Sequence, residues 1–516
     1  MTPHMATRMT TNAAALERAL QAIGAERLRG MRRGIEKESL RCDAAGRLAL
    51  TAHPPALGAA LTHPSITTDF SESQLELITA AHTRVDATLH ELRQIHRFVV
   101  PALGDERLWV SSMPCELPAD DEIPIGRYGV SNVGRAKTVY RRGLAHRYGR
   151  RMQTICGIHY NWSLPGLGND DYLALIRNFR RHAFVLLWLL GASPLVLASF
   201  VEGRTHDLAP IGRAFGLPHA TSLRMGRLGY QSDAQSCIAV SYNDLEGYCR
   251  SLEQALTTPY PPYEAIGVRH AGGEHLQLAP TLLQIENEFY ATIRPKRRIR
   301  TGERPLHALR ERGIEYIEVR CLDLDPFEPL GIGASTMHLL DVFLLHCLLS
   351  PSPPDTPAER EALARNQQAT AARGREPGLR LERDGREVPL VEWAAEILGA
   401  CKPIADGLDA AHGGAAHREA LRHALALLDR PQDTPSARVL ARTLDAHGGS
   451  FLDFGLACGE RTRASLLEPP LDAATEAQFR RQAEASIAEQ RAREAGDTLP
   501  FDAYLEAYLS PRSLRV

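Results

Sequence analysis

Acidic residues recur, with one histidine and one arginine, in four short stretches that lie far apart in the chain. The stretches cover residues 33–41, 67–76, 156–161 and 313–320. The side chains of interest in them are Glu36, Glu38, Asp69, Glu76, His159, Glu318 and Arg320. Carboxylate oxygens with one imidazole suit Mg²⁺ better than zinc or iron, and Mg²⁺ commonly bridges nucleotide phosphates. This pattern predicts a site for a divalent metal and a nucleotide.

Polar and apolar residues alternate in these stretches, which predicts β-strands. Successive side chains of a strand point to opposite faces, so Glu36 shares a face with Glu38, and Glu318 shares one with Arg320. Acidic groups aligned on one face repel each other unless cations lie between them. Any one of these glutamates alone is compatible with a solvated or salt-bridged surface residue, and His159 alone is compatible with a core histidine. The paired spacing is what favours the metal interpretation.

Composition and charge describe an ordinary globular protein. Of 516 residues, 44% are apolar and 24% are charged, and the length allows several domains or one large domain with a helical extension. The formal net charge is −2 and the isoelectric point is about 6.9. With so small a net charge, the protein has no overall electrostatic field that would attract nucleic acid or an anionic membrane. We therefore expect neither as a partner.

The cysteines and the apolar segments indicate a cytoplasmic protein. Nine cysteines occur without a Cys-x-x-Cys pair, which is typical of reduced, inertly packed thiols. Residues 1–20 lack the continuous apolar segment of a secretory signal. Residues 183–201 carry no charge, but Gly-Ala-Ser-Pro at 191–194 interrupts them. We expect a buried helix, a turn and a second buried segment there, not a membrane span. We also expect a monomer or a weak oligomer.

A proline-rich segment divides the chain. Residues 350–357 contain four prolines, which must end a helix predicted over 337–349. We expect a catalytic domain over 12–350 and a mainly helical C-terminal region over 351–516 that packs on it without chemistry of its own. Apolar residues at helical spacing also predict helices over 12–30, 85–103, 415–430 and 474–495.

Several common nucleotide and hydrolase motifs are absent from the sequence: the phosphate-binding P-loop, the full dinucleotide fingerprint, His-Glu-x-x-His and Gly-x-Ser-x-Gly. Metals held by carboxylates must therefore replace a phosphate-binding loop. Two basic stretches, residues 134–142 and 283–300, are candidates to bind phosphate. The first stretch is also compatible with a solvated face, and the second is also compatible with a nucleic-acid patch.

These stretches, in this order, resemble the proteobacterial type of glutamate–cysteine ligase. The similar segments lie at 33–41, 66–70, 112–115, 157–161, 191–194, 220–224, 228–230, 283–288, 293–297 and 313–320. They include Gly-Ile-His-Tyr-Asn at 157–161 and Gly-Ile-Glu-Tyr-Ile-Glu-Val-Arg at 313–320. The resemblance covers about residues 30–350 and is weaker beyond them. One departure is a short loop at 166–171, where the family often carries a longer insertion.

The resemblance implies an α+β fold of the glutamine-synthetase type, in which helices cover a curved, largely antiparallel sheet that forms a funnel-shaped active site. The positions of this sequence that match the family's metal ligands are Glu36, Glu38, Asp69, Glu76, His159 and Glu318, and the implied metal is Mg²⁺ or Mn²⁺. Glu318 and Arg320 are the catalytic candidates. The residues expected near the amino-acid substrates are Tyr140, Arg224, Tyr230 and Tyr290.

The implied reaction joins the γ-carboxylate of L-glutamate to the amine of L-cysteine through a γ-glutamyl phosphate. ATP is the co-substrate, and the reaction is the first step of glutathione synthesis. Two alternatives remain at this point: a ligase of the same mechanism that uses another amine, and a catalytically silent regulatory homologue. Selectivity for cysteine is the least secure inference, since each missing group is worth only about 1–3 kcal/mol.

Overall fold

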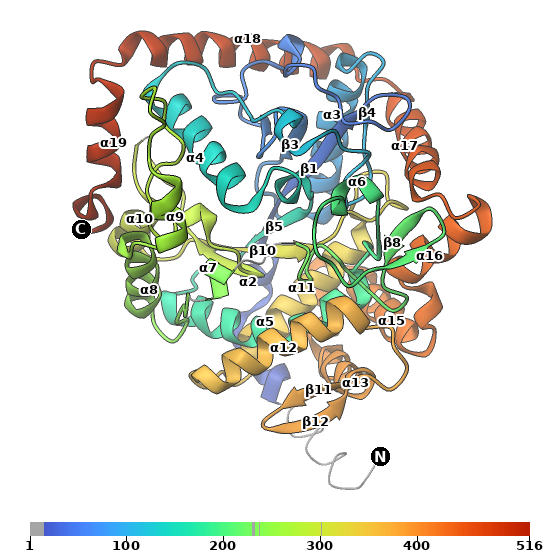
Figure 1. The fold of residues 1–516 in the computed structure, drawn as a ribbon. Helices are drawn as coiled ribbons and strands as arrows, with labels where there is room; N and C mark the ends of the chain where they lie inside the picture. Colours follow the sequence, from blue (N-terminus) through green and yellow to red (C-terminus); the bar gives the residue numbers. More distant parts are fainter. Residues whose placement is uncertain (1–14, 230–232, 237, 301) are drawn as a thin grey trace, which may run out of the picture.

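The computed structural model describes residues 15–229, 233–236, 238–300 and 302–516. At its centre lies a seven-stranded sheet (Figure 1). Its strands are β1 Arg32–Cys42, β2 Ile66–Thr68, β3 Gln74–Ile78, β4 Arg107–Leu108, β5 Ile158–Ser163, β9 Ile293–Lys296 and β10 Tyr316–Leu322. Their order is β2-β3-β1-β5-β10-β9, with β4 beside the end of β1. Each of these pairings is antiparallel. The α+β fold is confirmed.

The register of the strands brings the distant polar residues together. It places Glu36 opposite His159, Glu38 opposite Glu76, and Glu318 opposite both Asn161 and Arg294. Directly paired residues of an antiparallel ladder point to the same face. One face of the sheet, called the polar face below, therefore collects side chains from five strands. Asp69 belongs to the turn between β2 and β3, so residues 67–76 form a hairpin and not one strand.

The opposite face of the sheet, called the apolar face below, carries Ile35, Leu77, Tyr160, Ile317 and Val319, all fully buried. Three helices cover it, namely α3 Val85–Ala102, α5 Asn169–Leu190 and α11 Ala334–Leu349. Helix α11 is buried almost all round, which explains its nearly continuous apolar sequence. Helix α3 ends at Ala102, directly after Pro101 and within one residue of the predicted range 85–103.

The uncharged segment 183–201 lies inside the protein. It forms the end of α5, a turn at 191–194, strand β6 Leu195–Val196 and the short helix α6 Ala198–Val201, as predicted. None of the helices in the described part of the chain combines the length and apolar character that crossing a bilayer requires.

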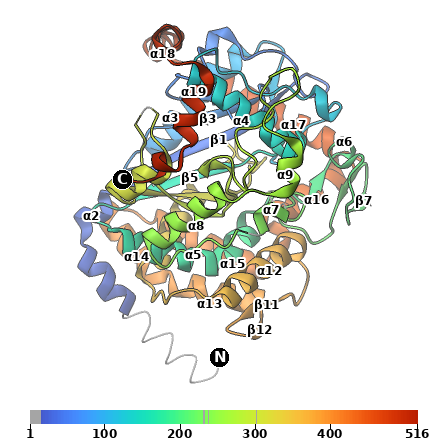
Figure 2. The ribbon, with the colours of Figure 1, turned by 60° about the vertical axis from the view of Figure 1, so that its left-hand side comes forward.

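Helix α4, Asn132–Tyr148, lies over the polar face, and the C-terminal helix α19, Phe501–Leu509, packs against α4 (Figure 2). The Ser131 side chain caps α4 by accepting a hydrogen bond from the Gly134 amide at 3.2 Å. A small second core joins the two helices to the segment around Leu278. The C-terminal helix therefore lies above the same face as the predicted metal ligands.

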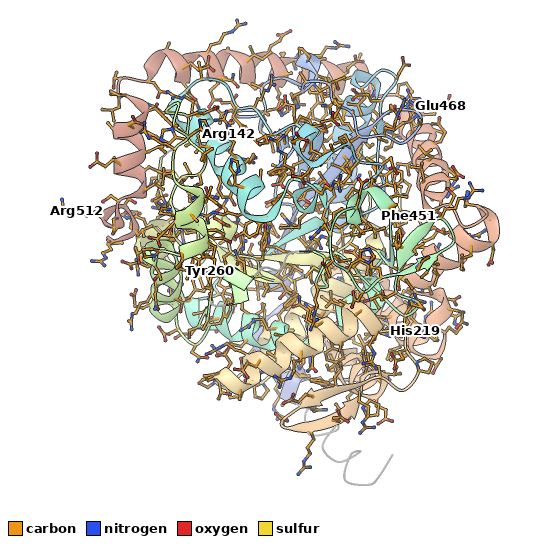
Figure 3. All side chains as sticks on the ribbon, in the orientation of Figure 1. Arg142, His219, Tyr260, Phe451, Glu468 and Arg512 are labelled. Atoms are coloured by element: carbon orange, nitrogen blue, oxygen red, sulfur yellow. The ribbon has the colours of Figure 1, made fainter. Side chains whose placement is uncertain are left out.

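The C-terminal region is mainly helical and wraps around the rest of the chain. Its other helices are α12 Pro357–Arg373, α13 Leu390–Ala400, α14 Lys402–His412, α15 Ala416–Asp429, α16 Pro435–Ala446, α17 Phe451–Leu467 and α18 Ala473–Gly496. Phe451 and Arg512 lie on opposite sides of the molecule (Figure 3). One hydrophobic core runs from Leu16 to Leu514. The division at residue 350 remains a prediction.

Other elements connect these layers. They are β7 Ala209–Ile211, β8 Ala214–Gly216, α7 Asp233–Ser236, α8 Leu245–Thr257, α9 Pro261–Ile266, α10 Pro305–Arg312 and the hairpin of β11 Arg380–Arg383 and β12 Arg386–Pro389. The prediction of one helix over 12–30 was wrong, although residues 12–14 lie outside the described residues. Residues 15–23 are helical, Gly24 follows with φ of 80°, and α2 Ala25–Arg29 is a separate short helix. The left-handed φ of Gly24 is what breaks the helix.

Candidate active site

A cavity of about 400 Å³ lies on the polar face of the sheet. It is lined by Glu36, Glu38, Asp69, Glu76, Tyr140, His159, Tyr290, Glu318 and Arg320. A second cavity, of about 730 Å³, is lined by Arg224, and Tyr290 and Arg320 line it as well. The two cavities thus adjoin at Tyr290 and Arg320. Tyr230 lies outside the described residues.

His159 lies among three of the glutamates. Its Nδ1 is 3.1 Å from Glu36 Oε2 and 3.8 Å from Glu318 Oε1, and its Nε2 is 3.6 Å from Glu38 Oε1. One ligand atom each from Glu36, Glu76 and His159 lies within 4.8 Å of the others. Oxygen and nitrogen atoms at such separations can bind a common divalent cation.

Several carboxyl groups lie close together in this site and repel one another. Burial and the neighbouring Asp69 raise the pKa of Glu38 to about 8. Burial, followed by repulsion from Glu36 and Asp69, raises the pKa of Glu76 well above its usual range. A bound cation would offset this repulsion and keep both groups ionised. The oxygen-rich set of donors therefore fits Mg²⁺.

Asn161 lies beside this cluster, opposite Glu318 in the strand register. Its Nδ2 donates a hydrogen bond to Glu36 Oε1 at 2.9 Å. Its Oδ1 is buried and has no hydrogen-bond partner among the described residues. A buried acceptor without a partner is costly unless a ligand or water satisfies it. Asn161 thus supports Glu36 from outside the residues that line the cavity, a role with no signal in the sequence.

Glu318 has a different environment, because cations lie beside it. Its side chain is 1% exposed, and its oxygens are 3.3 Å from Lys296 Nζ and 3.2 Å from Arg320 Nη1. Burial alone would raise its pKa, but Lys296 and then Arg320 hold that pKa well below the usual range. Burial and Arg320 lower the pKa of His159. His159 is therefore neutral near pH 7, the form in which imidazole binds a metal.

Arg320 is held from behind by a second arginine. Arg224 is buried, and its Nη2 donates to the main-chain oxygen of Arg320 at 2.8 Å. Its Nη1 lies 3.8 Å from Asp323 Oδ1. These contacts place Arg224 in the wall that supports Arg320 and at the edge of the second cavity. Contact between Arg224 and an amino-acid substrate remains a prediction.

Two tyrosines form part of the cavity wall. Tyr140 comes from α4, and Tyr290 follows the short helical turn Glu286–Glu288. Gln153 Nε2 donates a hydrogen bond to the Tyr290 hydroxyl at 2.9 Å. Burial raises the pKa of both tyrosines. They are therefore neutral phenols that offer rings and hydroxyl groups to a small substrate.

Basic residues from both basic stretches also line the cavity on the polar face. They are Lys137 and Arg141 of α4, and Arg294 and Lys296 of β9. The sequence predicted the stretches as possible phosphate binders but did not identify these four side chains. Which basic residues face the cavity is set by helix orientation and strand register, and neither is visible in the sequence.

The C-terminal region also reaches the cavity, because Tyr504 and Tyr508 of α19 lie in its wall. The sequence predicted that this region packs on the rest of the chain without chemistry of its own, and that remains a prediction. It did not indicate that two of its side chains would reach the cavity. Apolar residues at helical spacing predict that the C-terminal helices pack on the rest of the protein. They do not indicate the surface on which α19 packs.

Comparisons with known proteins agree with these features. A family model described as glutamate-cysteine ligase matches residues 17–370. A glutamate–cysteine ligase of Azotobacter vinelandii is 48% identical over 503 residues, which cover 93% of this chain and 94% of that protein. One of Alcanivorax borkumensis is 46% identical over 95% of this chain and 97% of its own.

Solved structures of similar proteins show the same fold. The crystal structure of a glutamate–cysteine ligase from Francisella tularensis in complex with AMP is 35% identical, with a TM-score of 0.88 over 93% of this chain and 97% of that one. A bifunctional glutathione synthetase from Pasteurella multocida is 26% identical, with a TM-score of 0.70, and this chain covers 57% of its length.

Proposed function

The chain belongs to the glutamate–cysteine ligase family, and we propose that it joins the γ-carboxylate of L-glutamate to the amine of L-cysteine with ATP as co-substrate. The observation that carries this proposal is the cavity in which a glutamate and histidine cluster meets the cationic pair of Lys296 and Arg320 beside Glu318. Similarity over nearly the full length of the ligases supports it.

The chemistry begins with activation of a carboxylate, because a carboxylate does not react with an amine near neutral pH. Transfer of the γ-phosphoryl group of ATP to the γ-carboxylate of glutamate gives a mixed anhydride, γ-glutamyl phosphate. We assign Arg320 to the transferred group, because its guanidinium is always charged and presents a fixed set of donors. Glu318 holds Arg320 and Lys296 in place through its ionised carboxylate.

The metal ligands in this proposal are Glu36, Glu38, Asp69, Glu76, His159 and Glu318, with Mg²⁺ as the metal and Mn²⁺ as an alternative. When bound, such an ion neutralises phosphate charge and orients the phosphates for in-line transfer. The mutual repulsion that raises the pKa of Glu38 and Glu76 supports this assignment, because a bound cation would offset it.

The second step is attack of the cysteine amine on the acyl phosphate, which forms the amide and releases phosphate. The adjoining cavities allow the reacting groups to approach Arg320 from two sides. We propose that Tyr140, Tyr290, Tyr230 and Arg224 surround the amino-acid substrates. Orientation in a shielded site favours amine attack over hydrolysis of the anhydride.

The protein is proposed to work in the cytoplasm, on small-molecule substrates. All eight cysteines within the described residues are buried and free, which suits a reducing compartment. The expectation of a monomer or weak oligomer remains a prediction.

The test is ATP-dependent phosphate release by the purified protein with glutamate and Mg²⁺, in the presence and absence of L-cysteine, with mass spectrometry of the product. Cysteine-dependent release with formation of γ-glutamylcysteine is the expected result. Preference for another amine would overturn the assignment of cysteine while keeping the mechanism. The absence of any glutamate-dependent release would overturn the proposed activity.

A further inference from the structure

A second cluster of metal-ligating side chains lies behind the sheet, on its apolar side. It consists of His338 and Asp341 of α11 and His417 of α15, with one ligand atom of each within 4.8 Å of the others. Asp341 and His417 are buried, with exposed fractions of 0% and 3%, and His338 is half-buried. Asp341 lies against Arg33 of β1, whose side chain points away from the polar face. The proposed catalytic reaction uses none of these residues.

The orientation of His417 is set by a carboxylate. Its Nδ1 is 2.9 Å from Asp409 Oδ1, and Asp409 also accepts the main-chain N–H groups of His417 and Arg418 at 3.0 and 3.1 Å. Because the carboxylate accepts, Nδ1 carries the proton, and Nε2 of neutral His417 keeps its lone pair. A carboxylate on one ring nitrogen with a metal on the other is the common arrangement of metal-bound histidines.

The lone pair of His417 Nε2 points toward the other two members. Nε2 is 3.3 Å from His338 Nδ1 and 4.0 Å from Asp341 Oδ2, and the two imidazole planes are at 76°. Two nitrogens bound tetrahedrally at about 2.0–2.1 Å from an ion are roughly 3.3–3.4 Å apart. The separation found here fits a shared ion without rearrangement of the rings.

Asp341 and His412 complete the surroundings. Asp341 accepts from the Arg33 guanidinium at 2.7–3.1 Å and from the Tyr160 hydroxyl at 3.0 Å, so it would be shared between Arg33 and an ion. The ring of His412 lies 5.7 Å from that of His417. His412 Nε2 is shielded from solvent, and no described residue offers it a hydrogen bond. It is a candidate for the fourth ligand.

We propose that His338, His417 and Asp341 form a structural site for a divalent transition-metal ion, with Zn²⁺ as the best match and His412 or water in the fourth position. Two imidazoles with one carboxylate favour Zn²⁺ over the Mg²⁺ that the oxygen-rich site on the polar face selects. The ion would fasten α15 and the end of α14 to α11 and, through Asp341, to β1. The competing interpretation is a direct hydrogen bond from His338 Nδ1 to His417 Nε2.

The experiment uses Co²⁺ as a spectroscopic substitute for Zn²⁺ in the full chain, after chelation and dialysis into excess Mg²⁺ to fill the polar-face site. We expect about one Co²⁺ per chain with strong visible absorption, because four-coordinate Co²⁺ absorbs far more than six-coordinate Co²⁺. Binding of Zn²⁺ should displace the Co²⁺ and raise the melting temperature.

Variants then locate the ion. His338→Gln and His417→Gln should each abolish the absorption, while His423→Gln, an exposed histidine of the same helix α15, should retain it. Glu36→Gln should also retain it, which separates this site from the polar-face site. Weak six-coordinate absorption in the wild-type protein, or a signal lost in Glu36→Gln, would overturn the proposal. The wild-type spectrum decides even if a histidine variant fails to fold.

Discussion

The two faces of the central sheet both bury charged side chains, but they balance charge differently. On the apolar face, Arg33 is paired with Asp341 in a buried ion pair at 2.7 Å, and Lys37 Nζ lies 2.8 Å from His96 Nε2. The charge of Arg33 is compensated by a carboxylate, whereas Lys37 has a neutral histidine as its hydrogen-bond partner. Buried charges with complete internal partners hold elements together.

On the polar face, strand β1, which also carries Arg33 and Lys37, places Glu36 and Glu38 in one cavity with Glu76 and Asp69. Burial and neighbouring carboxylates raise the pKa of Glu38 and Glu76, whereas His159 and, less strongly, Lys296 lower the pKa of Glu36. Carboxylates that repel one another are unfavourable for folding and favourable for a cationic ligand. The polar face therefore offers a site for a cation among its carboxylates, whereas the Arg33–Asp341 pair of the apolar face supplies its own charge compensation.

The largest expected effect is on turnover. Glu318→Gln removes a proposed metal ligand and the carboxylate that holds Lys296 and Arg320, so kcat should fall about 10³-fold or more in the phosphate-release assay. The matched control is Glu315→Gln, the same change at a residue paired with the exposed Arg298 at 2.9 Å. It should keep near wild-type kcat. Comparable activity of the two variants would remove Glu318 from the catalytic assignment.

On the apolar face we expect a large loss of stability and little change in turnover. Arg33→Met leaves Asp341 as a buried charge without its main partner, which should cost about 3–5 kcal/mol in the free energy of unfolding. Chemical denaturation measures the loss, and kcat per folded molecule should stay near that of the wild type. As control, Arg84→Met breaks an exposed ion pair with Asp86 and should have no measurable effect. If Arg33→Met were equally harmless, the structural role of this pair would be wrong.

The pH dependence of stability should reveal the uncompensated charge of the polar face. The folded-state pKa of Glu38 is raised from 4.5 to about 8, so the folded protein binds this proton more tightly than the unfolded chain. That stabilisation is complete below about pH 4.5 and is lost as the pH rises through about 8. Without metal, the melting temperature should fall by a few degrees between pH 5 and 8.

Mg²⁺ should reduce this fall, because it binds the ionised form, and Glu38→Gln should reduce it without metal. Thermal unfolding in chelator and in Mg²⁺, over a series of pH values, measures both effects. Parallel pH profiles for the wild type and the variant would show that Glu38 does not carry the repulsion.

The smallest effect is expected at Lys37. Burial lowers its pKa to about 7, so its stabilising contribution decreases as the pH falls from about 10.5 toward 7. Lys37→Met removes the hydrogen bond to His96 but also the burial of a charge. The free energy of unfolding at pH 7 should therefore change by only about 1 kcal/mol, with kcat unchanged. A loss of turnover in this variant would contradict the separation of the two faces.

Several parts of the fold could be predicted because their signal is local. The alternation in residues 33–41 and 313–320 indicated strands, and the apolar run before Gly191 indicated a buried helix. The helix predicted over 85–103 ends at Ala102, whereas the helix predicted over 12–30 is divided at Gly24. Local propensity at such points competes with packing, which the sequence does not display.

The sequence alone determined which residue types could bind a metal and which of them share a strand face, because alternation along a strand is a property of the backbone. Only the tertiary structure decided that Arg294 lies opposite Glu318, that Lys296 reaches the Glu318 carboxylate, and that Tyr504 and Tyr508 line the cavity. Strand register and helix docking follow from burial of apolar surface between segments hundreds of residues apart. That long-range burial turned scattered acidic residues into one site.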